Sequence, residues 1–409
     1  MSVAHQIRSF SPNARRILVS TFFASLGSSG FALLYNLYLL SLGYHADFIG
    51  LVASVTTLST ASAGPAAFML SRRIPLGRIL TFGFLLQVIG CTGLALSGAT
   101  AGILAFSVVF GLSQGFYWAP LPPFLAENSS SEERNHLFSI NIAVQLLAGI
   151  LGYLAAGQAP SLLAGALALE PTGSLRTTLL IATAAAGLAL LPILTVRRAI
   201  PAPGQPQTIA AISGGEESGQ RHVVALGASA LAMGVATGLS FPFFNVYFVT
   251  QQGASAEAVG RIFALSCVLS TVAALMAPAL AARAGYVRSI ALSRLAAGVA
   301  MAAMAASSSL GVAVATFWLR NFALQIMAPL IDAFGMAVVP ANRRAVQASV
   351  TSTLWHAGYG LTSIFSGLVI VGFGFAPPFI GAAVVILGNA IVFWLYYRDW
   401  RPSNRSASG

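Results

Sequence analysis

Two stretches half a chain apart, LYNLYLLSLG (residues 34–43) and FFNVYFVTQQG (residues 243–253), place an asparagine and a tyrosine in the same order near the end of a long apolar run. Asn245 follows Asn36 by 209 positions, and Tyr247 follows Tyr38 by the same 209. Further markers recur in the same order at spacings of 209 to 211: the pair Gly50 and Gly260, the LST at 58–60 and 269–271, and the APL at 119–121 and 328–330. A fixed spacing of this kind indicates an internal repeat, so the chain contains two copies of one unit.

The composition shows what kind of unit is repeated. Of the 409 residues 57% are hydrophobic and 8% are charged, whereas soluble domains carry roughly 25% charged residues. The mean hydropathy is +0.81. Twelve apolar runs are long enough to cross a bilayer, which takes about 20 residues: 17–40, 48–70, 79–97, 102–124, 138–158, 177–195, 223–249, 258–281, 289–308, 311–338, 346–371 and 376–397. We expect an all-α membrane protein with 12 transmembrane helices in two pseudo-symmetric halves of six.

A change in composition marks the boundary between the halves. Residues 200–220 are rich in Pro, Gly, Ser and Gln, which is typical of a flexible linker. We therefore predict an N-terminal six-helix bundle at 1–198, a cytoplasmic linker at 199–221, a C-terminal six-helix bundle at 222–397 and a cytoplasmic tail at 398–409. Since six is even, each copy starts and ends on the same side, which predicts an axis along the membrane normal and a cavity between the halves.

The basic charge is explained by topology. All 21 basic residues are arginine and the formal net charge is +11, a balance that can signal nucleic-acid binding. Here the arginines fall in short clusters between the apolar runs, mostly on one side, so the positive-inside rule predicts that both termini are cytoplasmic. We expect a multi-pass protein of the cell inner (cytoplasmic) membrane, a monomer without a nucleic-acid partner, and no cleaved signal peptide.

The turn after the second run carries a recognisable motif in both copies. AFMLSRRIPLGR (residues 67–78) and PALAARAGYVR (residues 278–288) resemble the G-x-L-A-D-R-x-G-R signature between helices 2 and 3 of the major facilitator superfamily. Arg72 and Arg283 match the first arginine of the signature, while Ser71 and Ala282 replace its aspartate. The resemblance covers essentially the whole chain and implies a secondary transporter.

The same resemblance implies a charged gate at the cytoplasmic helix ends. The predicted gate residues are Arg72, Arg78, Glu127, Arg283 and Arg288. Glu127 is the expected partner of Arg72 or Arg78. The alternative is that the arginines serve only as topology anchors, because exposed ion pairs contribute little.

The fourth run and its repeat differ in one residue type. GLSQGFYW (residues 111–118) resembles the family's R-x-x-Q-G pattern, with Gly111 in place of the arginine, and the residue 209 positions later is Arg320. An arginine inside the bilayer costs ~2.5–3.5 kcal/mol on the insertion scale, so Arg320 should face a wet cavity or a partner. Two interpretations stay open: an anchor for an anionic or carbonyl-bearing substrate, or a structural arginine bonded to Asn321, Gln325 or tyrosine hydroxyls.

The family's first, fourth, seventh and tenth helices line its cavity. On these helices the resemblance predicts substrate-binding residues Asn36, Tyr38, Gln114, Tyr117, Trp118, Asn245, Tyr247, Arg320, Asn321 and Gln325. Plain packing is the alternative for each aromatic residue. Asn36 and Asn245 either line the outer half of the cavity or hydrogen-bond across a closed outer gate, because an unsatisfied amide in hydrocarbon is costly.

Proton coupling needs a group that titrates during the cycle. The candidates are His356, whose ordinary pKa suits a physiological switch, and Asp332, for which a structural pair with Arg283 or Arg288 is the alternative. We expect a secondary active transporter that moves a small organic solute by alternating access, with proton-coupled efflux as the first hypothesis. Uptake of a sugar, organic acid or amino-acid-like solute, a lipid flippase of the same fold and a non-transporting receptor are the alternatives. No phosphate loop, HExxH or Cys-x-x-Cys motif appears, so we expect no enzyme, no metal and no cofactor.

Overall fold

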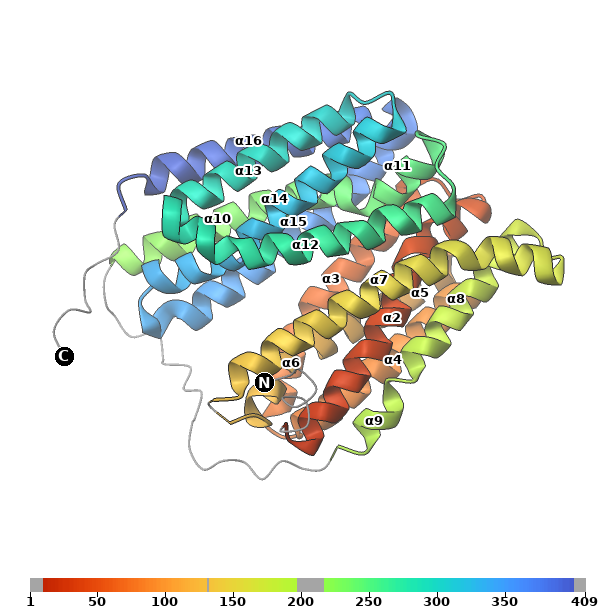
Figure 1. The fold of residues 1–409 in the computed structure, drawn as a ribbon, viewed down its shortest axis with the longest axis horizontal. Coiled ribbons are helices and arrows are strands. Elements are labelled where there is room, and N and C mark those ends of the chain that lie inside the picture. Colours follow the sequence, from red (N-terminus) through yellow and green to blue (C-terminus); the bar gives the residue numbers. More distant parts are fainter. Residues whose placement is uncertain (1–9, 131, 197–216, 401–409) are drawn as a thin grey trace. The chain divides into compact units, whose positions relative to one another are not determined.

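The computed structural model describes residues 10–130, 132–196 and 217–400, and every regular element in these ranges is a helix (Figure 1). The elements are α2 (Pro12–Ser41), α3 (Ala46–Ser71), α4 (Leu76–Leu96), α5 (Thr100–Trp118), α6 (Leu121–Glu127), α7 (Arg134–Leu167), α8 (Pro171–Gly187), α9 (Leu190–Leu194), α10 (Glu217–Ser240), η1 (Phe241–Phe243), α11 (Phe244–Thr250), α12 (Ala256–Ala284), α13 (Tyr286–Ala305), α14 (Leu310–Val338), η2 (Ala341–Arg343), α15 (Arg344–Phe373) and α16 (Ala376–Tyr397).

The predicted all-helical membrane fold is confirmed. Within the described ranges, 12 helical segments are long and apolar enough to cross a membrane, one for each predicted run. The largest difference is in the fifth run, which was expected to end at residue 158, whereas α7 continues to Leu167 past the buried Pro160. Membrane helices tolerate such prolines because neighbouring groups satisfy the freed carbonyl. Most of the predicted linker and tail lies outside the described residues.

Contacts divide the chain into two compact units. Unit 1 comprises Met1–Gln205 with Pro242–Val268, and unit 2 comprises Pro206–Phe241 with Leu269–Gly409. Unit 1 therefore includes α11 and the start of α12, which belong to the second sequence copy. In each unit we call the helix ends that carry the clustered arginines, such as Arg72 and Arg283, the arginine end, and the other helix ends the opposite end.

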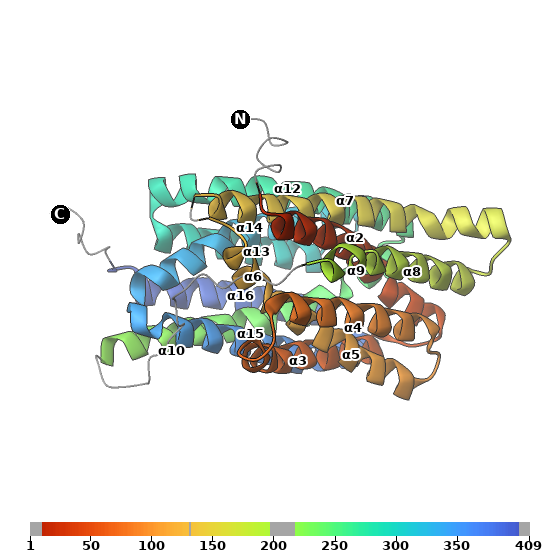
Figure 2. The ribbon, with the colours of Figure 1, turned by 90° about the horizontal axis from the view of Figure 1, so that it is seen from below.

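Unit 1 is organised around α2, which packs against α7 and α8 and lies beside α7 in both views (Figures 1 and 2). Small residues make this close approach possible. A Cβ added at Gly27 would lie 2.2 Å from the Ala182 carbonyl oxygen, and one at Gly152 would lie 2.4 Å from the Leu26 carbonyl oxygen. Close backbone contact of this kind is what holds helices together in lipid, where burial of apolar surface gives little driving force.

Unit 2 uses the same device between α10 and α15. A Cβ at Gly234 would lie 2.1 Å from the Trp355 carbonyl oxygen, and one at Gly238 would lie 2.3 Å from that of Tyr359. Near the arginine end, Phe334, Phe393 and Tyr397 form a buried aromatic group with edge-to-face contacts. Glycine contacts and aromatic packing therefore fix the helices of this unit.

The seventh spanning segment is broken just before Asn245. α10 ends at Ser240, three residues form η1, and α11 begins at Phe244. Pro242 lies in the break, and proline lacks the N–H that a continuous helix would need. Beside the break, the Val246 N–H donates to the Asn245 side chain, and the Pro242 carbonyl oxygen accepts from the Asn36 side chain.

The glycine contacts yield a matched test on one helix. Gly152→Ala places a methyl group against the Leu26 carbonyl oxygen, whereas a Cβ at Gly165, also on α7, meets nothing within 4 Å. We expect Gly152→Ala to destabilise the protein by about 1–3 kcal/mol, the usual cost of overpacking. Gly165→Ala should leave stability unchanged or slightly raised, because alanine favours helix. Melting temperatures of the purified variants check this, and equal melting temperatures would contradict the close α2–α7 contact.

Candidate functional site

The repeated asparagines meet each other in unit 1. Asn36 on α2 donates through Nδ2 to the Pro242 carbonyl oxygen at 2.7 Å and to Asn245 Oδ1 at 3.2 Å. Asn245 on α11 donates through Nδ2 to the Leu33 carbonyl oxygen at 2.8 Å. We call these four residues the asparagine clamp.

The asparagine clamp is symmetric in sequence as well as in space. Each asparagine donates to the carbonyl three positions before the other asparagine, Leu33 before Asn36 and Pro242 before Asn245. The break in the helix at Pro242 helps to make its carbonyl available, and Asn245 Oδ1 also accepts from the Val246 N–H at 3.0 Å. Of the two sequence-based interpretations, the geometry gives the hydrogen bond between symmetry mates.

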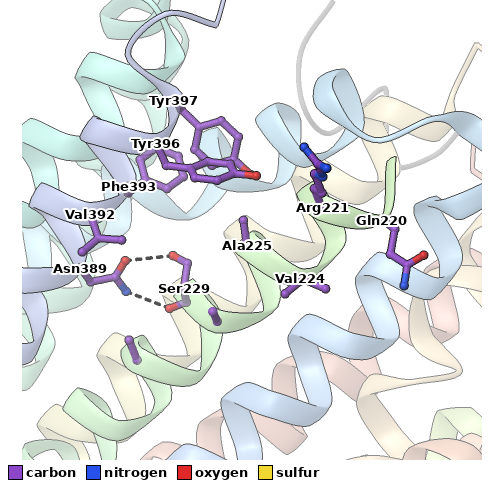
Figure 3. A pocket seen from close by; sticks show the side chains of 12 residues that line it. Gln220, Arg221, Val224, Ala225, Ser229, Asn389, Val392, Phe393, Tyr396 and Tyr397 are labelled. Atoms are coloured by element: carbon purple, nitrogen blue, oxygen red, sulfur yellow. Dashed lines mark hydrogen bonds between the residues drawn. The ribbon is translucent and has the colours of Figure 1, made fainter. Parts of the chain in front are cut away.

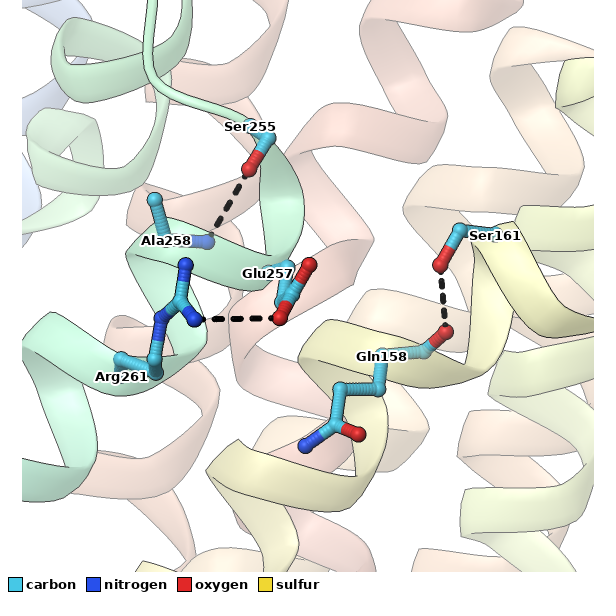
Figure 4. A network of polar contacts seen from close by, with 6 residues as sticks. All are labelled: Gln158, Ser161, Ser255, Glu257, Ala258 and Arg261. Atoms are coloured by element: carbon cyan, nitrogen blue, oxygen red, sulfur yellow. Dashed lines mark hydrogen bonds and ion pairs between the residues drawn. The ribbon is translucent and has the colours of Figure 1, made fainter.

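A second contact joins the two sequence copies within unit 1. A Cβ at Gly260 of α12 would lie 2.6 Å from the Tyr153 carbonyl oxygen of α7, and one at Gly157 would lie 3.1 Å from the Gly260 Cα. The polar groups beside this contact bond within their own helices: Arg261 pairs with Glu257 on α12, and Ser161 donates to the Gln158 carbonyl on α7 (Figure 4). The contact therefore rests on backbone packing.

The two repeated tyrosines lie in the interior of unit 1. Tyr38 is 0% exposed. Its hydroxyl donates to the Ala95 carbonyl oxygen at 2.9 Å and accepts from Arg176 Nε at 3.0 Å, joining α2 to α4 and α8. Tyr247 is also buried, and its hydroxyl accepts from Gln252 Nε2 at 2.8 Å. Both geometries show structural bonds, and a substrate contact for either tyrosine stays a prediction.

Helix packing accounts for the glycine that replaces the family's arginine on α5. A Cβ at Gly111 would lie 2.3 Å from the Thr56 carbonyl oxygen of α3, and one at Gly115 would lie 2.4 Å from the Ala63 Cβ. Thr60 Oγ1 also donates to the Gly111 carbonyl at 3.0 Å. An arginine at position 111 would force α3 and α5 apart, so the first copy cannot carry the cation here.

The other predicted residues of α5 have three different environments. Gln114 is half-buried, Tyr117 is buried and Trp118 is exposed. The Tyr117 hydroxyl donates to Thr21 Oγ1 at 3.5 Å, and its ring contacts Phe84 and Trp118. The three residues lie on the same helix, but in the part of the chain that the structure describes no hydrogen bond links any two of them.

The cation of the second copy hydrogen-bonds to side chains of unit 2 through its two terminal nitrogens. Arg320 on α14 is 3% exposed, and its guanidinium donates to Asn321 Oδ1 at 2.8 Å and to Ser240 Oγ at 3.5 Å. Ser240 ends α10, so the arginine sits where this helix breaks. Gln325, one turn further along α14, is half-buried. The Asn321 bond agrees with the structural interpretation, and the role as substrate anchor stays a prediction.

The coupling candidates lie on α15 and α14. His356 is half-buried, its Nδ1 lies 2.7 Å from the Ser352 carbonyl oxygen, and its ring packs edge-on against Trp355. Asp332 is exposed. Among the described residues no ion pair joins Asp332 to Arg283 or Arg288, so the expected structural pair is not formed in this structure.

The predicted gate residues are also without mutual ion pairs. Within the described ranges the ion pairs that involve exposed side chains are Arg261 with Glu257 and Arg398 with Asp399. Arg72 lies over the Phe68 ring at 5.1 Å instead, and Glu127 is exposed at the end of α6. The expected pairing of Glu127 with Arg72 or Arg78 is therefore not seen.

Sequence reasoning missed a second buried cation. Arg294 on α13 was grouped with the topology arginines, but its side chain is 2% exposed. It donates through Nη1 to Asn389 Oδ1 at 3.0 Å and through Nε to Met327 Sδ at 3.2 Å, and it lies over the Phe393 ring at 4.7 Å. The repeat spacing of 210 that relates Arg288 to Arg78 places Phe84 at the equivalent position. An arginine in one copy where the other has a phenylalanine was the feature of the sequence that could have identified Arg294 as a buried cation.

Comparison with known proteins agrees with this architecture. The model of the Major Facilitator Superfamily matches residues 17–362. A bacterial homologue of the human lysosomal transporter Spinster, in an inward-facing and unoccupied conformation, has a TM-score of 0.78 at 15% identity, over 98% of this chain and 100% of that one. The nucleoside transporter NupG gives 0.76 at 12% identity over 95% and 100%, and an auto-inhibited peptide transporter of the POT family gives 0.75 at 12% over 98% and 99%. No curated protein sequence matches the chain.

Proposed function

Since the chain belongs to the major facilitator superfamily, we propose that it moves a small organic solute by alternating access, with the asparagine clamp as a latch between its two sequence copies. Membership in this family makes it a membrane-embedded secondary transporter and not an enzyme. The observation that carries the proposed latch is the reciprocal bonding of Asn36 and Asn245.

A latch must be strong enough to hold one conformation and weak enough to open. The asparagine clamp consists of hydrogen bonds between neutral groups, each worth about 0.5–1.5 kcal/mol net. The neighbouring contact at Gly157 and Gly260 is backbone packing, which can separate without leaving a charge in lipid. Both contacts lie toward the opposite end of the helices, which we assign to the outer side of the membrane.

The proposed orientation follows from the arginines. We place the protein in the inner membrane of the cell. By the positive-inside rule, its arginine end and both termini are on the cytoplasmic side. We further propose two six-helix halves joined by the 199–221 linker. The gate residues Arg72, Arg78, Glu127, Arg283 and Arg288 would form their ion pairs in the conformation in which the clamp is open.

The substrate and its direction follow as hypotheses. Arg320, with Asn321 beside it, would recognise an anionic or carbonyl-bearing group after exchanging its present bonds for the solute. We propose export of the solute in exchange for protons, and uptake of a sugar, organic acid or amino-acid-like solute is the competing hypothesis. Two structural neighbours carry nucleosides and peptides by their names, so both are sensible members of a first compound panel.

The latch can be tested without knowing the substrate. Spin labels at Glu170 and Ser308, both exposed near the opposite end, report the distance between the copies. Asn36→Leu or Asn245→Leu removes a donor of the clamp, and a loss of about 1 kcal/mol should raise the population of longer distances about fivefold. Cross-linking Asn36→Cys to Asn245→Cys in a protein without Cys91 and Cys267 should leave only the shorter distances.

Tyr44→Phe is the matched control. It removes the hydroxyl that contacts the Gly98 carbonyl and Thr100, bonds that stay within the first copy. It should not change the distance distribution. Unchanged distributions in both asparagine variants and in the cross-linked protein would refute the latch.

The role of Arg320 can be tested by ligand-induced thermal shifts. Purified protein is screened with anionic and neutral metabolites, nucleosides and peptides. Anionic compounds that stabilise the wild type should lose at least about tenfold in affinity in Arg320→Lys, because lysine supplies a point charge without the planar fork of the guanidinium. Arg261→Lys, an exposed control, should bind normally. Equal stabilisation of Arg320→Ala by the same anions would exclude the anchor.

Proton coupling through His356 predicts a separation of binding from accumulation. In proteoliposomes with a pH gradient, His356→Gln should bind a solute from the screen with unchanged affinity but fail to accumulate it, because glutamine cannot titrate. His136→Gln, a change of an exposed residue on α7, serves as the histidine control, and Asp332→Asn tests the second candidate. Gradient-driven accumulation that persists in both His356→Gln and Asp332→Asn would rule out coupling by these groups, and the side of accumulation gives the direction.

A further inference from the structure

Unit 2 contains a groove away from all the residues assigned above. A cavity of about 830 Å³ lies between α10 and α16 at the arginine end, with Arg221, Val224, Ala228, Asn389, Val392 and Tyr397 among its lining residues (Figure 3). We call it the α10–α16 groove. It lies near the first turns of α10 and the last turns of α16, where a spanning segment meets the membrane surface.

The chemistry of the groove changes along its length. Gln220 and Arg221 supply polar and cationic side chains in the first turns of α10. Further along, Val224 is 62% exposed and Val392 is 65% exposed. An exposed apolar surface of this kind on a spanning helix is suited to contact with an acyl chain. A ligand that matches this groove therefore has an anionic head and an apolar chain.

Two polar atoms beside the groove have no hydrogen-bond partner among the described residues. The Tyr397 side chain lines the groove and is almost completely buried, yet its hydroxyl makes no hydrogen bond. The His222 ring stacks on the Tyr397 ring at 5.7 Å, and its buried Nδ1 is also without a partner. Buried polar groups are normally satisfied, so each such atom needs an explanation, and a bound polar group provides one.

Arg294 adds positive charge behind the wall of the groove. Its guanidinium holds Asn389 and lies over Phe393, and both of these residues line the groove. Asn389 is fixed from the other side by Ser229 of α10, through bonds of 3.0 and 2.9 Å (Figure 3). In the described part of the chain no carboxylate pairs with Arg294. The field of this buried cation favours an anion nearby, because screening is weak away from water.

We propose that the α10–α16 groove binds an anionic phospholipid from the surrounding leaflet, with the phosphate at Arg221 and Tyr397 and an acyl chain along Val224, Ala228 and Val392. Cationic pockets between membrane helices are suited to such headgroups. The site lies on other residues than the clamp and the Arg320 cluster. It therefore depends only on the membrane location of the protein and not on its transport cycle.

The test uses the full-length protein purified in detergent and freed of lipid. Its melting temperature is followed while palmitoyl-oleoyl-phosphatidylglycerol, the matching phosphatidylcholine or inorganic phosphate is added. Phosphatidylglycerol should stabilise the wild type at concentrations about tenfold below those of phosphatidylcholine. Inorganic phosphate alone should give no shift, because it lacks the chain that fills the apolar part of the groove.

Three variants probe the head and the chain separately. Arg221→Gln and Tyr397→Phe should raise the phosphatidylglycerol concentration that gives half the shift about tenfold, and Ala228→Phe should do the same by filling the groove. The matched controls are Arg261→Gln, Tyr44→Phe and Ala303→Phe, which change two exposed residues and one half-buried residue outside the groove. Equal stabilisation by both lipids, an equal response to inorganic phosphate, or unchanged phosphatidylglycerol affinity in Arg221→Gln and Ala228→Phe would each overturn the proposal.

Discussion

An amide side chain inside a membrane must find hydrogen-bond partners within the protein, and this constraint explains the feature that organises unit 1. Asn36 and Asn245 each donate to a backbone carbonyl of the other sequence copy. Lipid offers no alternative partner, so the two segments that carry these residues are held side by side. The segment Pro242–Val268 consequently clusters with the first copy, although its sequence belongs to the second.

The two sequence copies share one helix arrangement, but the buried arginines Arg294 and Arg320 both belong to the second copy. At the position equivalent to Arg320, the first copy has Gly111, whose hydrogen faces the Thr56 carbonyl oxygen so closely that no side chain fits. At the position equivalent to Arg294 it has Phe84, which is buried against Tyr117. The first copy has thus used both positions for helix packing. The second copy bears the cost of desolvating two cations, and both guanidinium groups hydrogen-bond to side chains of unit 2.

The sequence predicted the fold well because its signals are local. Apolar runs of membrane length and a fixed repeat spacing require no knowledge of side-chain direction, and all twelve spans were found. The end of α7 was placed too early, because the helix continues past Pro160 and a proline inside a membrane helix is tolerated. The partners of the charged residues could not be predicted, because they depend on which side of a helix faces which neighbour. Arg294 shows this: from sequence it was counted with the arginines that set the topology, whereas in space it is enclosed by Asn389, Met327 and Phe393.

The strength of the asparagine clamp suits the latch proposed above. Three hydrogen bonds join the copies there, and together they contribute about 2–4 kcal/mol at the usual net value for each bond. Bonds between membrane helices average nearer 0.6 kcal/mol in measured cases, which brings the total toward the lower figure. A difference of a few kcal/mol keeps one conformation dominant while the other remains populated at about 0.1–10%. A buried ion pair would be a worse latch, since opening it would leave charges without partners in lipid, and this is a physical reason for the repeat to place amides at these two positions.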